Sequence, residues 1–221
     1  MASTTVTTIQ AVKGALSAAR IGTYEAATGA VGNDPAALEL YAWNAQVSGA
    51  LLTPLHICEV VVRNAVSDAL EARYGHRWPW SPGFERSLPN PAVGYSPCKD
   101  LQSVRRNAHT TGKLIPELKF VFWQKMFTSR HDARLWNTHL MLVLPNLDPS
   151  EPVDVLRQDI YNELEQIRAL RNRIAHHEPI FSRNLTDDFQ RIVNLVEFRC
   201  KETADWMVRN QQASAFINAR P

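Results

Sequence analysis

The sequence contains few cysteines and no long apolar run. Its 221 residues include only three cysteines, Cys58, Cys98 and Cys200. They are scattered and odd in number, which gives neither a disulfide framework nor a zinc-ligand spacing, so we expect a reducing cytoplasm. The amino terminus lacks a basic start followed by an apolar core, so no secretory signal is expected. No stretch of about 18 apolar residues is present, so no membrane-spanning segment is expected either.

The sequence also lacks a glycine-rich phosphate loop and a paired-carboxylate metal motif. We therefore expect no cofactor and no metal ion, and a nucleotide-modifying enzyme has little support. The formal net charge is only +2, so any indication of a nucleic-acid partner must come from a local cluster of charges. The hydrophobic content of 45% and charged content of 21% are typical of a globular protein.

The first half of the chain has helical periodicity. Asp34 and Pro35 are an N-cap followed by proline at the first helical position, which predicts a helix over 35–51. Pro54 predicts a break or kink before a second helix over 55–74. Gly75 is well placed as the C-cap of that second helix.

The remainder predicts more helices around one irregular segment. Residues 76–98 are rich in proline and tryptophan and predict an ordered but irregular connection. Further helices are predicted over about 99–111, from near Pro116, over 133–143, over 153–177 and over 186–209. We predict a single all-helical domain over 1–221, in which residues 1–16 are flexible.

The end of the predicted long helix carries an unusual concentration of cationic and titratable side chains, in "LRNRIAHHEPIF" at 170–181. At about 100° per residue, with Ile174 at the centre of the apolar stripe, Arg171 lies about 60° from it. Asn172 and His176 lie about 160° away, on either side of the opposite pole. They are four residues apart, so the Asn172 amide is expected to orient the His176 ring.

Two further observations bear on this pattern. Glu165 shares that pole and Arg168 lies close to it, so the polar face is expected to point away from the core. The Arg-x4-His spacing alone is weak evidence, since Arg134 and His139 repeat it elsewhere in the chain. We interpret that second copy as coincidental, because the residues between them look like core residues. On pattern alone, residues 171–176 also fit a solvated helix end.

The motif "LRNRIAHHEPIF" resembles the signature of the Abi-like (abortive infection) family of the HEPN superfamily. The stretch "ALELYAWNAQVSGALLTPLHICEVVVRNAV" at 37–66 is similar to the amino-terminal helices of that family. "GKLIPELKFVFWQKMF" at 112–127 is similar to its middle section. The resemblance covers roughly 17–206, in the same order along the chain.

The resemblance implies an all-α, HEPN-type helical bundle with an amino-terminal helical extension and an irregular Pro/Trp-rich connection. It also implies a homodimer in which two Arg-x4-His motifs face each other and form a metal-independent endoribonuclease site. The residues that match the motif are Arg171 and His176 as catalytic residues and Asn172 as the polar neighbour.

These residue types suit RNA cleavage by the adjacent 2′-hydroxyl, which leaves a 2′,3′-cyclic phosphate and a 5′-hydroxyl. A histidine titrates near neutral pH, so His176 is expected to move the proton. Arginine binds two phosphate oxygens and keeps its charge, so Arg171 is expected to hold the phosphate. Asn172 would fix the His176 ring.

Other polar residues have both functional and structural interpretations. Arg168, Arg173 and His177 could form a basic rim for the RNA backbone. Arg173 could equally be a surface charge, and His177 could serve the helix end. Glu178 could support the site, cap a neighbouring backbone or pair with an arginine.

Three residues of the earlier helix have a similar double interpretation. Glu59, Arg63 and Asn64 could form a structural polar network or a network that supports the site.

The predicted function is a toxin-like endoribonuclease in phage defence, with RNA as its substrate and an antitoxin or a phage-derived trigger as a possible regulator. It is expected in the cytoplasm, without a membrane partner. The alternative is a catalytically inactive HEPN module that binds RNA or protein and regulates another factor.

Overall fold

The computed structural model describes residues 2–221, which form an all-α fold without a β-strand. The twelve α-helices within these residues are α1 (Ala2–Leu16), α2 (Ala18–Thr28), α3 (Ala36–Tyr74), α4 (Pro82–Ser87), α5 (Pro97–Arg105), α6 (Thr111–Leu114), α7 (Phe120–Met126), α8 (Asn137–Val143), α9 (Val153–Ala175), α10 (Leu185–Arg199), α11 (Lys201–Arg209) and α12 (Ala213–Asn218). Short 3-10 helices η1 (Trp78–Trp80), η2 (Ile115–Glu117) and η3 (Ser129–His131) and the π-helix η4 (Asp132–Trp136) connect them.

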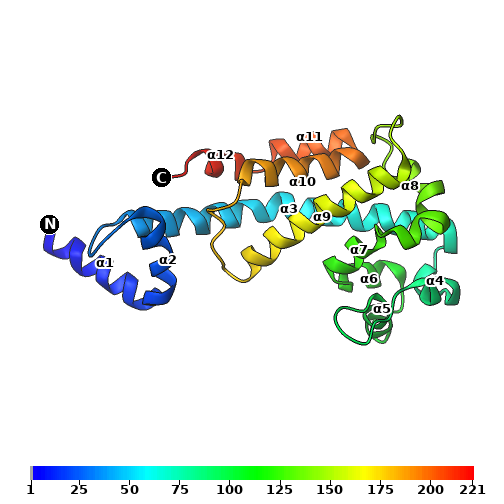
Figure 1. Cartoon of the computed structure of the whole chain (residues 1–221), viewed down its shortest axis with the longest axis horizontal. Coiled ribbons are helices and arrows are strands. Elements are labelled where there is room, and N and C mark those ends of the chain that lie inside the picture. The colour runs from blue at the N-terminus through cyan, green and yellow to red at the C-terminus, as the bar shows by residue number, and fades with distance from the viewer. Residues whose placement is uncertain (1) are drawn as a thin grey trace.

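Helix α3 is the central helix of the fold. The helices that pack against it include α2, α8, α9, α10 and α12. In Figure 1 it runs through most of the long dimension, with α9 crossing it and α10 alongside. Both chain ends lie toward the end where α1 and α2 are found, and α4 to α6 lie at the opposite end (Figure 1).

Of the break or kink predicted at Pro54, the break is wrong, because the 39-residue helix α3 continues through that proline. A proline inside a helix loses one backbone hydrogen bond and costs about 3 kcal/mol. Pro54 is itself buried, and the adjacent Leu51, Leu55 and Cys58 are 0–4% exposed. Burying these apolar side chains outweighs the local cost of the proline. The C-terminal end of α3 is as predicted, with Gly75 as its C-cap. Gly75 has φ 83°, and its N–H donates to the Glu71 carbonyl.

The length and apolar composition of α3 are sufficient to cross a membrane, which corrects the expectation that no segment could do so. Such a helix is weak evidence for a membrane protein, since the core helices of globular proteins meet the same criterion. In this fold α3 carries the polar ion pair Glu59–Arg63 and packs against helices on several sides. In the most apolar 18-residue window of α3, 33% is buried within the chain.

The connection over 76–98 is ordered by aromatic packing, as predicted, and it contains η1 and α4. Trp78 and Phe84 are fully buried, with ring centroids 5.2 Å apart. The indole N–H of Trp78 donates to the Ser67 hydroxyl of α3 over 3.1 Å. This segment is therefore fixed to the central helix despite its many prolines.

Several predicted helix boundaries need correction. The helix predicted over 99–111 ends at Arg105, and the one predicted from Pro116 is η2 followed by α7. The helix predicted over 186–209 is split at Cys200, whose backbone is extended, and α12 follows it. Asn146 satisfies carbonyl groups at the end of α10, which have no partner within the helix. Its backbone N–H donates to the Phe198 carbonyl, and its side-chain amide donates to the Glu197 carbonyl.

Candidate functional site

Helix α9 ends at Ala175, so both histidines lie beyond its last turn rather than within it. His177 has φ 56°, a left-handed conformation that usually favours glycine. Its N–H donates to the Ile174 carbonyl, and the Glu178 N–H donates to the Arg173 carbonyl over 2.8 Å. This pair of bonds is a Schellman motif with a histidine at the glycine position. The helix is thus terminated by backbone geometry before Pro179 is reached.

Arg171 contacts an acidic residue of the central helix. Its Nε lies 3.7 Å from Glu59 Oε2, and the Arg171 side chain remains 43% exposed. Glu59 also forms an ion pair with Arg63, one turn further along α3. Burial lowers the pKa of Arg63, and the nearby charge of Arg171 lowers it further, whereas Glu59 opposes this shift. Two guanidinium groups therefore share one carboxylate, which leaves a net positive cluster.

This cluster unites part of the predicted polar network with the predicted catalytic arginine. Glu59 and Arg63 are paired with each other, and Glu59 also contacts Arg171, which is the arrangement that a network supporting the site predicts. Asn64 is exposed on α3 and has no side-chain partner within residues 2–221. Asn64 therefore does not belong to the cluster.

His176 is exposed and is not brought to Arg171 within the single chain. The two residues differ by about 140° around the helix axis at about 100° per residue. The expected hydrogen bond between the Asn172 amide and the His176 ring is absent from the described part of the chain, where only the His176 N–H donates to the Asn172 carbonyl. Within the described residues, Arg171 and His176 therefore make no contact with each other.

Arg168 is held by neighbours on its own chain. It pairs with Glu165, which also accepts a hydrogen bond from the buried amide of Gln124 on α7. The Arg168 hydrogen bond is the main cause of the lowered pKa of Glu165. Glu165 keeps 39% of its side chain exposed, in line with a polar face that points away from the core, although Gln124 of α7 contacts it. Asn172, about two turns further on, is half-buried, and His176 is exposed.

The last turn and the residues after it are tied down by local contacts. Arg173 Nε lies 3.5 Å from Glu178 Oε2, which confirms the expected pairing of Glu178 with an arginine. Arg20 of α2 donates to the His177 carbonyl over 2.6 Å. His177 thus serves the helix end, as one of its two interpretations proposed.

Some residues that organise this region were not predicted from the sequence. Asn44 of α3 is 5% exposed and accepts from the Ile180 N–H over 2.8 Å, which fixes the segment after α9 against α3. In Figure 1 this segment turns back across α3 before α10 begins. Asn44 belongs to "LYAWN" at 40–44, but its partner lies far away in the sequence, so no local pattern could identify the bond.

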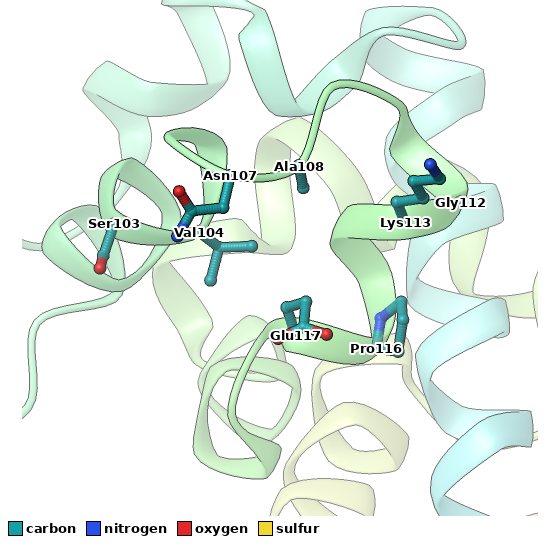
Figure 2. A pocket seen from close by; sticks show the side chains of 8 residues that line it. All are labelled: Ser103, Val104, Asn107, Ala108, Gly112, Lys113, Pro116 and Glu117. Atoms are coloured by element: carbon teal, nitrogen blue, oxygen red, sulfur yellow. The ribbon is translucent and has the colours of Figure 1, made fainter.

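A large cavity lies away from the motif. It has a volume of about 700 Å³ and lies among α5, α6 and η2. Figure 2 shows its lining, with Val104 and Ala108 across from Pro116 and Glu117. None of the predicted site residues lines it. Its position provides no argument for the Arg-x4-His chemistry.

A smaller cavity of about 280 Å³ lies between α2, α3 and the end of α9, where Ile174 and His177 line it. Arg171 and His176 line neither this cavity nor the large one. Within residues 8–221, for which side chains are described, no group of three or more His, Cys, Asp or Glu side chains is arranged to hold a metal ion.

Comparisons with known proteins found no matching family model, no matching curated protein and no matching solved structure.

Proposed function

We propose that the chain is a metal-independent endoribonuclease of the HEPN type, a toxin-like factor in phage defence. The single observation that supports this most is the solvent-accessible arrangement at the end of α9. Arg171 is held by Glu59 with 43% of its side chain exposed, and His176 is exposed just beyond the helix. Both side chains are accessible to a substrate or to a second subunit.

In this proposal Arg171 binds the scissile phosphate. Its closest contact with Glu59 is through Nε. This leaves the two terminal amino groups of the guanidinium for two phosphate oxygens. The second cation of the cluster, Arg63, keeps the local charge positive although Glu59 is close by. As negative charge develops on the phosphate, the fixed Arg171 cation stabilises the transition state.

His176 moves the proton. One histidine removes the proton of the 2′-hydroxyl, and a second histidine donates one to the leaving 5′-oxygen. A homodimer supplies both, and it also brings the His176 of one copy toward the Arg171 of the other. The products are a 2′,3′-cyclic phosphate and a 5′-hydroxyl. The protein acts on RNA in the cytoplasm without a membrane partner, and an antitoxin or a phage-derived trigger controls it.

A second candidate is a non-cleaving HEPN module that binds RNA or protein. Two observations favour it: Glu59 lies beside the phosphate-binding arginine, and the Asn172 amide does not orient the His176 ring. In this case Arg171 would belong to a binding surface, and His176 would contribute little.

Cleavage assays distinguish the two candidates. Purified wild type is incubated with tRNA, rRNA and mRNA in EDTA, with and without lysate from phage-infected cells, and the RNA ends are sequenced. We expect cleavage with cyclic phosphate ends. His176→Ala should reduce it by at least about 100-fold, the usual contribution of general acid–base catalysis, while RNA binding stays intact. Arg134→Ala is the matched control, because Arg134 is exposed in the coincidental Arg-x4-His copy. Intact RNA under all conditions would favour the binding module.

A further inference from the structure

The cavity between α2, α3 and the end of α9 has the properties of a binding pocket. Its volume is about 280 Å³. Tyr24 from α2, the α3 residues Tyr41, Asn44 and Ser48, and His177 from beyond α9 line it. The three α3 residues are three or four positions apart, so they lie on one face of the helix. The rest of the lining is apolar or glycine, and no Asp, Glu, Lys or Arg contributes to it.

Two polar groups of this cavity have no partner within the described residues. Asn44 is 95% buried, since its exposure is 5%. Its side-chain oxygen accepts from Ile180, but no hydrogen bond from its Nδ2 group is present within residues 2–221. The Ser48 hydroxyl is likewise without a partner there. Asn44 Nδ2 and the half-buried Ser48 hydroxyl are both reached by solvent, so each can donate to a ligand acceptor in place of water.

Two tyrosine rings of the cavity wall differ in exposure: Tyr24 is buried and Tyr41 is half-buried. The Tyr24 ring is 1% exposed and lies between Tyr41 and Phe181, with centroid distances of 5.0 and 5.2 Å. Tyr41 is only half-buried, so its ring can stack with a planar ligand. Burial raises the pKa of Tyr24, which keeps its hydroxyl neutral as a hydrogen-bond donor.

The cavity is lined by the chain segment that carries the proposed catalytic residue, although His176 itself does not line it. Ile174 and His177 line it, and His176 lies between them in the chain. The backbone of His177 is fixed by the Schellman motif and by the hydrogen bond from Arg20. A ligand in the cavity therefore contacts an anchored part of the chain, one residue along from His176.

We propose that this cavity binds one unpaired nucleobase of the RNA, adjacent to the scissile phosphate. The proposal rests on the RNA-cleaving function proposed above. A base presents a flat ring for Tyr41 and edge groups for Asn44 and Ser48, and the lack of charged side chains favours a neutral ring over a phosphate. The cavity volume of about 280 Å³ lies just below the ~300–1,000 Å³ typical of small-molecule pockets, which suits one ring system.

The test measures RNA binding in a His176→Ala background, so that cleavage does not interfere. Fluorescence anisotropy is recorded with labelled hexa-uridylate, hexa-adenylate and a hexamer of abasic tetrahydrofuran spacers. Ser48→Leu fills the cavity and should weaken binding of at least one base-containing hexamer by about tenfold, the effect of losing one stacked base. Binding of the abasic hexamer should not change. Gly112→Leu is the matched control, because it introduces the same side chain into the large cavity of Figure 2.

If the Ser48→Leu variant fails to fold, crosslinking provides an independent test that does not need this variant. A hexamer containing 4-thiouridine is crosslinked to the His176→Ala protein, and the crosslinked peptides are identified by mass spectrometry. Crosslinks at Tyr41 or His177 support the proposal. Crosslinks only elsewhere, no binding of any hexamer, or equal binding of the abasic and base-containing hexamers would each overturn it. Binding is measured without cleavage. If wild type does not cleave RNA, the proposed nuclease function is refuted, but the test of base binding in this cavity can still be interpreted.

Discussion

Replacing Glu59 with glutamine tests the cluster that holds Arg171. Glu59→Gln keeps the shape of the side chain and removes its charge. Arg63 then loses its only anionic partner within residues 8–221, and Arg171 loses its contact at 3.7 Å. Two guanidinium groups are left near each other without a carboxylate between them. We expect the free energy of unfolding to fall.

The size of this loss follows from burial. At 3.7 Å and an effective dielectric constant of about 20, the Arg171–Glu59 attraction is about 4.5 kcal/mol before desolvation. Arg171 is 43% exposed, so screening reduces its net contribution to below about 1 kcal/mol. Glu59 and Arg63 are 15% and 16% exposed, and removing one partner of a fully buried pair costs about 3–5 kcal/mol. A loss of about 2 kcal/mol lies between these limits.

Thermal unfolding followed by circular dichroism measures this loss at fixed protein concentration, because a dimer would make Tm depend on concentration. A loss of about 2 kcal/mol corresponds to a Tm lower by about 4–8 °C for a chain of this length. A double-mutant cycle with Arg63→Met should give a coupling energy of about 1–2 kcal/mol between Glu59 and Arg63. A Tm within about 1 °C of wild type, which is a quarter or less of the expected shift, together with additive effects in the cycle, would refute the reasoning.

Three further perturbations test other parts of the fold. His177→Gly removes a side chain from a left-handed backbone position, so urea denaturation should show a gain of about 0.5–1 kcal/mol; a loss would contradict the assigned helix end. At Gly49 within α3, an added Cβ meets no atom within 4 Å, so Gly49→Ala should raise the free energy of unfolding by about 0.5–1 kcal/mol. The same gain for the matched variant Gly22→Ala in α2 would support helix propensity as the cause. Burial and the nearby Arg130 and Arg134 lower the pKa of His131 from 6.5 to about 4, so the folded state disfavours its charged form. Stability should be independent of this group above pH 6.5 and decline by about 3 kcal/mol as the pH falls from 6.5 through 4. His131→Gln should flatten that decline, and an unchanged pH profile would argue against the buried neutral histidine.

The helical class of the protein follows from local patterns. In α9 apolar residues recur every three or four positions, and Leu164, Leu170 and Ile174 are all buried as that spacing predicts. Gly75 ends α3 because glycine accepts a positive φ that other residues resist. The pairing of Arg173 with Glu178 is similarly local, since both residues belong to one helix end. Such features involve neighbours in the chain, so the sequence alone predicts them.

Features that depend on distant partners were decided by the tertiary structure. Pro54 lies within a continuous helix because the surrounding burial exceeds the cost of one lost hydrogen bond. Glu165 accepts a hydrogen bond from Gln124 while staying 39% exposed, because α7 packs beside that part of α9.

The candidate site shows the same division. The sequence by itself determined that Arg171 and His176 lie at the end of an amphipathic helix, since helical periodicity is a property of consecutive residues. Only the tertiary structure brought Glu59 to Arg171, and Asn44 and Tyr24 to the segment around His177. Contacts of this kind depend on how whole helices pack, because packing energies are summed over many side chains from several elements and no local pattern encodes them.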